Sequence, residues 1–250
     1  MKAAILTDTT KCIGCHECVF ACKKENHLPS DVPRRWDLDD GLSAKNWTAI
    51  VEGPGRAFVR KQCRHCLEPA CASACPVGAL QKTAAGPVVY DDSRCMGCRY
   101  CMMACPYGIP RYDWDDAAPH VRKCIFCYSR LAHGRQPACT EACPTKATIF
   151  GDRDELLAEA RRRIAADPGK YIDKIWGERE AGGASVLLIS NVDLSFLTDG
   201  HALGASPLPA TTVTAMGAVP FAFTGVLAAM AGVNWIIGRR MARQKDESDE

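Results

Sequence analysis

The stretch CIGCHECVFAC at residues 12–22 and the stretch CMGCRYCMMACP at residues 95–106 share one cysteine spacing, C-x2-C-x2-C-x3-C. Two further groups of four cysteines have related spacings, C-x2-C-x4-C-x3-C over residues 63–75 and C-x2-C-x11-C-x3-C over residues 124–143. The four groups account for all 16 cysteines of the 250-residue chain, and three of them end in Cys-Pro. The chain therefore contains four complete sets of four thiols.

Thiolates at these spacings are typical ligands of a [4Fe–4S] cluster, which takes one sulfur ligand for each iron. A C-x2-C-x2-C loop can surround three irons of one cluster, while the fourth cysteine, three residues later, usually binds the neighbouring cluster. A proline directly after that cysteine fixes the backbone where the chain leaves the site. We therefore expect four [4Fe–4S] clusters, arranged in two pairs that exchange their fourth ligands.

The two middle groups are predicted to form one such pair, because the segment between them suits a short hairpin. Gly86-Pro87 provides the turn and Val88–Tyr90 a strand. The two outer groups then pair by elimination. The predicted ligands are Cys12, Cys15, Cys18 and Cys143 for cluster A; Cys22, Cys124, Cys127 and Cys139 for cluster B; Cys63, Cys66, Cys71 and Cys105 for cluster C; and Cys75, Cys95, Cys98 and Cys101 for cluster D.

This pairing predicts an α+β fold made of two interleaved modules of the bacterial two-cluster ferredoxin type. An inner module at about residues 60–112 is inserted into an outer module, and together they occupy residues 1–151. Residues 152–205 are expected to add a helix and an extension that wraps back onto the modules. The helix is predicted over Asp152 to Ala166, with Asp152 as its cap, and Ala184 to Ser190 is predicted to be a strand.

Two other uses of paired cysteines fit the spacing less well. Structural zinc sites use two C-x2-C pairs and leave the third and fourth cysteines of each run unexplained. A disulfide scaffold is disfavoured because neighbouring cysteines in C-x2-C-x2-C runs would have to close short, strained loops. A chain of this length can also form a core without disulfides.

Composition and charge are those of an ordinary globular protein, with 47% hydrophobic residues, 24% charged residues and a net charge of +2. So small a net charge gives no support for nucleic-acid binding. Four clusters with their thiolates would change it to about −6. Eight basic residues lie beside the ligands, and we expect about half of them to be simply solvated and the others to favour the reduced clusters: Lys11, Lys23, Lys24, Arg64, Arg94, Arg99, Arg122 and Lys123. His16 and His65 are predicted to be hydrogen-bond donors or surface groups rather than iron ligands.

The C-terminal region predicts one transmembrane helix. No charged residue occurs from Ala202 to Gly238, and Val213 to Ile237 is mostly apolar and long enough to span a bilayer. We place the anchor at residues 206–238 and a charged tail at residues 239–250. A buried helix of a soluble protein is the alternative, and the length of the stretch disfavours it.

Basic residues follow this helix directly, whereas the twenty residues before Val213 contain no lysine or arginine. The residues are Arg239, Arg240, Arg243 and Lys245. The positive-inside rule predicts a bacterial inner-membrane protein with a cytoplasmic C-terminus and a periplasmic cluster domain. Residues 1–11 contain neither a signal peptide nor a twin-arginine motif, so we expect export in the folded state with a partner that carries the leader.

Several segments resemble the four-cluster iron–sulfur subunits of membrane oxidoreductases. They are ACPVGAL (74–80), GCRYCMMACPYGIPRYD (97–113), RKCIFC (122–127), ACTEACPTKATIFG (138–151) and YIDKIWGEREAGGASVLLIS (171–190). The resemblance is strongest to the iron–sulfur subunit of hydrogenase-2-type [NiFe] hydrogenases, with the β subunit of membrane formate dehydrogenase second. In the similar nitrate-reductase β subunit a tryptophan replaces one cysteine, whereas all sixteen are present here.

The resemblance implies an electron-transfer subunit of a respiratory chain. Its partners would be a catalytic subunit, most simply a [NiFe] hydrogenase that oxidises H2, and a membrane cytochrome b or quinone-site subunit. A formate dehydrogenase or other molybdopterin oxidoreductase is the alternative partner. A stand-alone membrane-anchored ferredoxin or redox sensor is an alternative of another class. The sequence shows no catalytic signature of its own, neither a nucleophile–base set nor a nucleotide-binding loop.

Overall fold

The computed structural model describes residues 2–29, 40–114, 117–198 and 202–248. They belong to two units, Met1–Leu208 and Pro209–Glu250. The first unit combines short strands with short helices, which confirms the mixed helix and strand content predicted from the sequence. The described part of the second unit is dominated by one long helix, α7 (Ala210–Ser248).

A three-stranded sheet in the order β8–β1–β9 organises the first unit. Its middle strand β1 (Ala3–Asp8) pairs antiparallel with β8 (Thr148–Asp152) and parallel with β9 (Val186–Ile189). All six residues of β1 are buried. Because successive side chains of a strand point to opposite faces, β1 contributes to the core on both sides.

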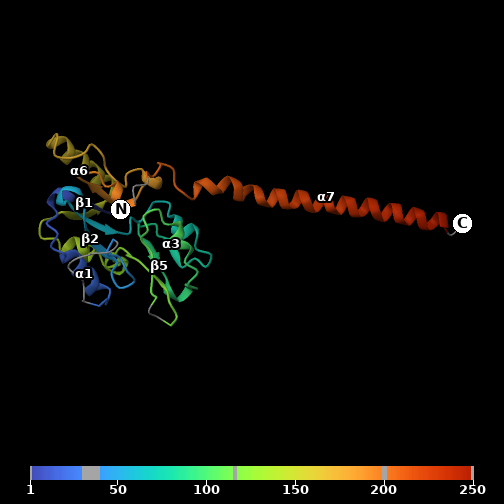
Figure 1. Cartoon of the computed structure of the whole chain (residues 1–250), viewed down its shortest axis with the longest axis horizontal. Helices are drawn as coiled ribbons and strands as arrows, with labels where there is room; N and C mark the ends of the chain where they lie inside the picture. Colours follow the sequence, from blue (N-terminus) through green and yellow to red (C-terminus); the bar gives the residue numbers. More distant parts are fainter. Residues whose placement is uncertain (1, 30–39, 115–116, 199–201, 249–250) are drawn as a thin grey trace. The chain divides into compact units, whose positions relative to one another are not determined.

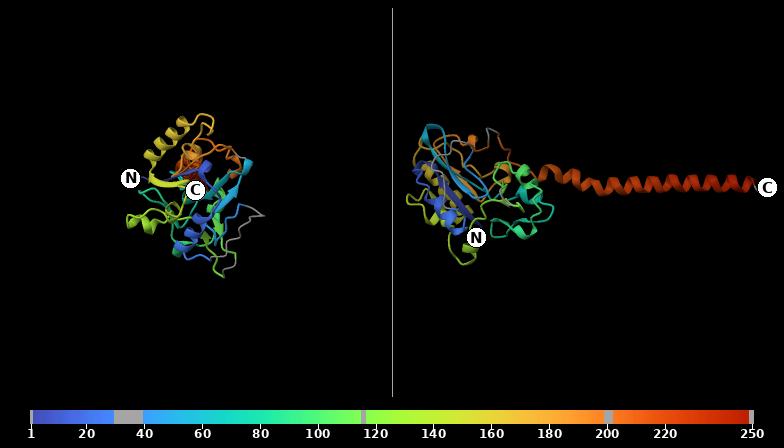
Figure 2. Two further views of the ribbon diagram at one scale, coloured as in Figure 1. Left: turned by 90° about the vertical axis from the view of Figure 1, so that its left-hand side faces the viewer. Right: turned by 60° about the horizontal axis from the view of Figure 1, so that its bottom comes forward.

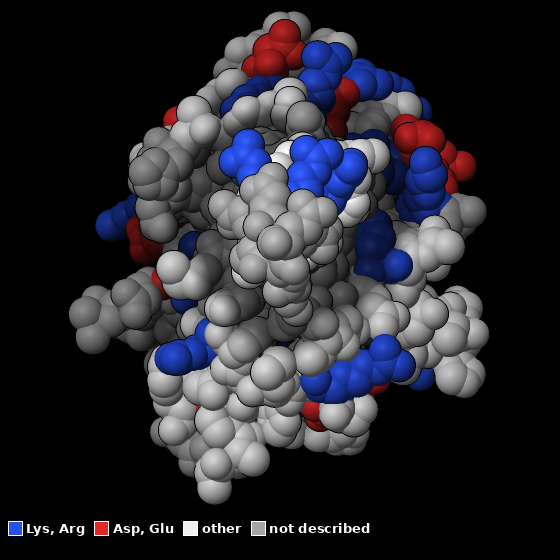
Figure 3. Space-filling model, turned by 90° about the vertical axis from the view of Figure 1, so that its right-hand side faces the viewer, with Lys and Arg blue, Asp and Glu red and all other residues white. Residues whose placement is uncertain are grey.

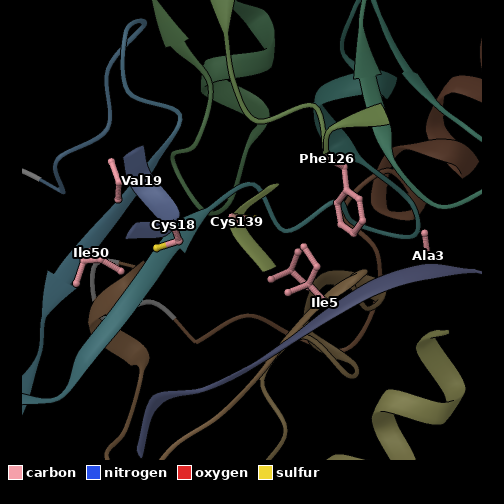
Figure 4. Close-up of a cluster of buried hydrophobic side chains, with 8 residues drawn as sticks. Ala3, Ile5, Cys18, Val19, Ile50, Phe126 and Cys139 are labelled. Atoms are coloured by element: carbon pink, nitrogen blue, oxygen red, sulfur yellow. The ribbon is translucent and has the colours of Figure 1, made fainter. Parts of the chain in front are cut away.

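The two faces of β1 pack against different partners. Ala4 and Leu6 contact the apolar stripe of α6 (Arg153–Ala166). On the other face, Ile5 packs with Phe126 and with two of the predicted cluster ligands, Cys18 and Cys139 (Figure 4). Figure 1 shows α6 on one side of β1 and α1 (Glu17–Glu25) on the other. The sheet therefore separates an ordinary helical layer from the cysteine-bearing loops.

Three two-stranded hairpins and several short helices carry the rest of the first unit. The hairpins are β2 (Thr48–Glu52) with β3 (Phe58–Gln62), which Figure 2 shows as a light-blue pair of arrows, β4 (Leu80–Lys82) with β5 (Val88–Tyr90), and β6 (Arg111–Tyr112) with β7 (Val121–Arg122). The short helices are α2 (Ala70–Ser73), α3 (Tyr100–Ala104), α4 (Tyr128–Ala132) and α5 (Ala138–Glu141). Helix α1 packs against α5, and α2 packs against α3.

The β4–β5 pair and the β8–β1 pair repeat one arrangement. Leu80, five residues after Cys75, pairs with Tyr90, which lies five residues before Cys95. In the sheet, Thr148 pairs with Thr7, and these residues lie at the same distances from Cys143 and Cys12. The two pairs differ in connectivity, because a short turn joins β4 to β5, whereas most of the first unit lies between β1 and β8.

Several predicted elements are confirmed. The strand Val88–Tyr90 is β5, and β9 lies within the predicted strand Ala184 to Ser190. Helix α6 begins directly after Asp152, whose carboxylate accepts a hydrogen bond of 3.0 Å from the backbone N–H of Asp154. Leu156, Leu157 and Ala160 form its buried stripe.

The predicted apolar helix near the C-terminus is also present. Within α7, the segment Ala210–Met241 is 32 residues long and contains an 18-residue stretch with a mean hydropathy of 1.7, which by length and composition suffices to cross a bilayer. The helix continues through Pro220, and the hydroxyl of Thr224 donates a hydrogen bond of 3.0 Å to the Pro220 carbonyl.

Candidate metal centres

Three of the four predicted cysteine sets surround separate cavities. The thiols predicted for cluster A line a cavity with about 380 Å³ of empty space. Those predicted for cluster B line one of about 340 Å³, and those predicted for cluster D line one of about 310 Å³. In each case cysteines from two distant groups meet, so the fold brings together thiols that are far apart in the sequence.

The cysteines predicted for cluster C are also close together. Cys63 packs with Cys66 and Cys105 in one buried cluster of side chains. Burial raises the pKa of the Cys66 thiol to about 12, and the neighbouring Cys63 and Cys105 raise it further in the same direction. The pKa of Cys71 is raised by burial first and then by Cys63, Cys105 and Cys66. The structure thus brings the thiols of each predicted set close to one another, and their assignment as ligands of four clusters stays a prediction.

The residue directly before the second cysteine has a left-handed backbone in all four loops. It is Gly14 (φ 67°), His65 (φ 49°), Gly97 (φ 72°) or Phe126 (φ 63°). In three loops its backbone N–H donates to the sulfur of the first cysteine, as from Phe126 to Cys124 at 3.4 Å. A left-handed residue turns successive N–H groups inward and forms a concave anion site of the kind found at iron–sulfur clusters.

The three Cys-Pro groups share a second device. Three residues after the fourth cysteine the backbone is again left-handed, at Gly78, Gly108 and Lys146. The next residue donates its N–H back to the cysteine sulfur, as from Ala79 to Cys75 at 3.2 Å, and likewise from Ile109 to Cys105 and from Ala147 to Cys143. Proline has no N–H and fixes φ, so it starts this turn without competing for the sulfur.

Cys22 is the exception, because no proline follows it and α1 continues to Glu25. Its sulfur instead accepts a hydrogen bond of 3.6 Å from the Asn26 side-chain amide. The same amide group donates to the Cys22 carbonyl at 2.8 Å, which holds it at the end of the helix. Asn26 therefore replaces the backbone donor of the other three groups.

Gly14 offers a test of this loop geometry. A Cβ atom at Gly14 would lie 2.9 Å from ring carbons of Phe58, whereas a Cβ at Gly55, which has nearly the same φ of 65°, would meet nothing within 4 Å. Both alanine variants lose about 1–2 kcal/mol for the left-handed backbone. We expect Gly14→Ala to lower the unfolding temperature well below that of Gly55→Ala and to deplete iron. Equal unfolding temperatures and iron contents in the two variants would contradict this.

Burial opposes ionisation of the ligand thiols, and hydrogen bonds partly offset it. Burial raises the pKa of Cys18 to about 12 and that of Cys101 to about 11. For Cys143, burial acts to raise the pKa, but hydrogen bonds from the N–H groups of Thr148, Ala147 and Thr145 and from the Thr145 hydroxyl together outweigh it, so the pKa is lowered. Since iron binds thiolates, loading the buried sets releases protons.

The basic residues beside the ligands divide into two classes. Lys23, Arg64 and Lys123 are buried, whereas Lys11, Lys24, Arg94 and Arg99 are exposed and Arg122 is half-buried. Lys123 donates to the carbonyls of Val88 and Cys124 at 2.6 and 2.9 Å. Water screens the exposed cations and does not reach the three buried ones, and an effect of any of the eight on the cluster potentials stays a prediction.

His65 differs from its prediction. It is fully buried, and its Nδ1 accepts a hydrogen bond of 2.9 Å from the Val88 backbone N–H, so it is neither a surface group nor a donor at that nitrogen. Its ring makes an edge contact with Phe126, at 4.8 Å between centroids. This aromatic pair joins the loop of the predicted cluster C set to that of the cluster B set.

Two cations near the thiols, Arg60 and Lys82, were not predicted from the sequence. Lys82 donates to the carbonyls of His65, Cys66 and Gly86 and so fastens a cluster-binding loop. Arg60 lines the cavity of the cluster A thiols. Two of its nitrogens have no hydrogen-bond partner among the described residues, and the same holds for the amide nitrogen of Gln62, which lines the cavity of the cluster B thiols. Unfilled donors facing thiol-lined cavities fit a bound anionic group such as a thiolate-ligated [4Fe–4S] cluster.

Comparison with known proteins agrees with this chemistry. Two family models, each described as a 4Fe-4S dicluster domain, match residues 11–80 and residues 56–153. The hydrogenase-2 operon protein HybA of Escherichia coli O157:H7 is 38% identical over 241 residues, which cover 78% of this chain and 73% of HybA. The chain belongs to the family of ferredoxin-like iron–sulfur electron-transfer subunits of oxidoreductases, and it carries [4Fe–4S] clusters.

Two further relatives have different coverage. A protein of Nitratidesulfovibrio vulgaris is 42% identical over 229 residues, which cover 86% of this chain and 61% of the relative. The iron–sulfur subunit of the nitrate-inducible formate dehydrogenase of Escherichia coli K12 is 34% identical over 266 aligned positions, which cover all of this chain and 89% of that subunit. This chain thus spans less than two thirds of the Nitratidesulfovibrio relative.

Proposed function

We propose that this chain conducts electrons between a catalytic subunit and a membrane subunit through four [4Fe–4S] clusters held by the predicted ligand sets A, B, C and D. The observation that carries the proposal is the meeting of cysteines from distant groups around common cavities. When bound, the clusters supply one-electron storage and transfer. The chain itself positions them, excludes water and adjusts their potentials, and has no substrate chemistry of its own.

The packing suggests the order of the relay. One buried cluster of side chains joins Cys12 and Cys18 of set A to Cys139 of set B. A second joins Cys124 of set B to cysteines of set C, and a third joins Cys71 of set C to cysteines of set D. Neighbouring sets thus share a packed core in the order A–B–C–D, with A and D at the two ends.

Both proposed ends are accessible to partners. At set A, Cys15 is exposed and the neighbouring Ile13 is 61% exposed. At set D, Met96, Met103 and Trp114 are exposed, although large apolar side chains are normally buried. We propose that these two surfaces receive the electron donor and the electron acceptor.

We further propose the domain arrangement of two interleaved ferredoxin-like modules. The inner module comprises sets C and D with the β4–β5 hairpin, and the outer module comprises sets A and B with the β8–β1 pair. The repeated register of the two strand pairs supports this division. Residues 152–205 would then cover the outer module, with the anchor at 206–238 and the tail at 239–250.

The partner proposed first is a [NiFe] hydrogenase, because HybA belongs to a hydrogenase-2 operon and its similarity extends over 73% of its length. The formate dehydrogenase subunit favours a second candidate, a molybdopterin enzyme, because its alignment includes the whole of this chain with the apolar helix. The chemistry of the acceptor side is that of a membrane cytochrome b or quinone-site subunit in both cases.

We propose that α7 crosses the bacterial inner membrane with its C-terminal end in the cytoplasm. Basic residues follow the apolar segment, and the Arg239 guanidinium lies 4.9 Å from the centre of the Trp235 ring. Tryptophan and arginine together are typical of a membrane interface. Protease treatment of spheroplasts is expected to digest residues 2–198 and spare the apolar helix. Protection of the cluster domain would contradict this orientation.

The decisive experiment is purification of the complex from membranes, followed by metal analysis. We expect about sixteen irons and equal labile sulfide per chain, together with nickel in the co-purifying catalytic subunit. Molybdenum in place of nickel would select the second candidate. A chain that purifies alone with its clusters would indicate a stand-alone ferredoxin, and zinc without sulfide would overturn the proposal.

A further inference from the structure

Arg60 occupies an unusual position for a charged residue. It lies in the middle of β3, paired with Ile50 of β2, and is only 3% exposed. Its Nη2 donates a hydrogen bond of 2.9 Å to the Thr148 hydroxyl. Its Nε and Nη1 have no partner within the described part of the chain. A guanidinium stays charged at all ordinary pH values, so this is a buried charge with unfilled donors.

Other cations of the protein are accommodated differently. Many lysine and arginine side chains lie on the surface, where water surrounds them, as the face drawn in Figure 3 illustrates. The buried Arg130 pairs with the carboxylates of Glu25 and Glu141. Buried Lys123 donates to two backbone carbonyls. Within the described residues Arg60 has no such carboxylate partner, although a buried unpaired charge is strongly unfavourable.

The surroundings of Arg60 indicate where its counter-charge belongs. The side chain lines the cavity of the set A thiols. Cys12, Cys18 and Thr148, which accepts the hydrogen bond from Arg60, line the same cavity. The guanidinium also lies beside the Cys139 side chain of set B, with Cys124 close by. The guanidinium therefore lies between two thiol sets.

We propose that Arg60 is a shared counter-charge of clusters A and B, which raises the reduction potentials of both and is held in place by Thr148. This inference rests on the proposed ligand sets. A fixed cation favours the more negative, reduced form of a cluster, and its effect is large where water is excluded. A single charge facing both clusters stabilises an added electron on either one. It would therefore reduce the difference in potential across the A-to-B step.

The test is a redox titration of the purified holoprotein complex, followed by low-temperature EPR, for the wild type, Arg60→Gln and Arg60→Lys. Arg60→Gln keeps hydrogen-bond donors but removes the charge. We expect two of the four midpoint potentials to fall, so that at the wild-type midpoint the reduced-to-oxidised ratio of those two clusters drops about tenfold, equivalent to 59 mV for one electron. Arg60→Lys keeps the charge and is expected to change the ratio less than about threefold.

The remaining two clusters are an internal control, and Gln62→Met is a matched one. Gln62 lies two residues after Arg60 on β3 and is buried to the same extent as Arg60. Of the cavities of sets A, B and D, it lines only that of set B. We expect Gln62→Met to move at most one potential. Four unchanged potentials in Arg60→Gln, or an equal shift of all four, would overturn the inference while leaving the electron-transfer proposal intact.

Assembly itself gives the second readout. If Arg60→Gln loses iron while Arg60→Lys retains the full content with unchanged potentials, the positive charge is required to hold clusters A and B, which supports the inference. If Arg60→Lys loses the same iron, the role of Arg60 is steric and the inference fails. A wild-type protein without iron would instead refute the proposed function.

Discussion

Removal of iron from the holoprotein is expected to unfold the first unit while α7 remains helical in detergent. The strands of this unit are two to six residues long, and its loop helices α2, α3, α4 and α5 have only four or five residues each. Helices and hairpins of this size are not stable alone in water. Ligand cysteines supply a large part of the packed core, as Cys71 and Cys101 do beside Leu80. The clusters therefore replace much of the core of an ordinary domain.

Iron binding and folding are one equilibrium. We therefore expect iron removal to lower the free energy of unfolding of the first unit by more than the stability of an ordinary domain, which is about 5–15 kcal/mol. Near-UV circular dichroism and amide hydrogen exchange, recorded before and after anaerobic chelation, would measure it. The β4–β5 hairpin should lose its protection completely. Residual protection is expected only where α6 covers the three-stranded sheet, because that layer contains no ligand. Native-like exchange of β4 and β5 after chelation would contradict the prediction.

The exchange of fourth ligands predicts a non-additive result between cysteine variants. Cys12 and Cys143 belong to the same predicted set, although they lie at opposite ends of the outer module. The double variant Cys12→Ala/Cys143→Ala is therefore expected to lose or convert one cluster, as each single variant does. Cys12→Ala/Cys22→Ala is expected to affect two clusters, although these residues share one sequence group.

Iron, sulfide and EPR measurements on the purified complex distinguish the two arrangements, since a cluster missing one ligand appears either as about four lost irons or as a three-iron signal. If each sequence group instead bound its own cluster, Cys12→Ala/Cys143→Ala would affect two clusters and Cys12→Ala/Cys22→Ala only one. Cys66→Ala/Cys105→Ala provides the matched test for the inner module, where one damaged cluster is again expected. The comparison requires that each single cysteine variant still folds. A single variant that retains the other three clusters has folded.

The sequence restricts the possible cysteine sets because cluster geometry limits which spacings can share one cluster, and the structure places the thiols of sets A, B and D around common cavities. Other features could be predicted because neighbouring residues alone determine them. These are the Cys-Pro turn, the strand Val88–Tyr90 and helix α6. Arg60 could not, since it lies outside the cysteine groups on a strand whose partner and register depend on distant contacts. In the sequence, Arg60 is only an arginine within the strand FVRKQ, where polar and apolar residues do not alternate regularly. An arginine in such a strand is normally expected on the surface.

A short acidic motif precedes two of the cysteine groups at the same distance. Asp8-x-Thr10 before Cys12 matches Asp91-x-Ser93 before Cys95. In both, the aspartate accepts from the backbone N–H at 3.1 Å and from the hydroxyl at 2.6 Å. The two aspartates differ in their surroundings. Asp8 is completely buried, forms an ion pair with Arg163 and accepts a hydrogen bond from the Tyr171 hydroxyl, whereas Asp91 is exposed.

The pairing of β1 with β8 has a consequence for synthesis of the chain on the ribosome. Cys22 emerges about 120 residues before Cys143, which at about 5–20 residues per second is a delay of roughly 6–24 s. During that time β1 has no partner strand and the first thiols have no completed cavity, whereas residues 63–105 can already fold locally. Iron–sulfur insertion should therefore begin in the middle of the chain, and the cysteines made first would be filled last.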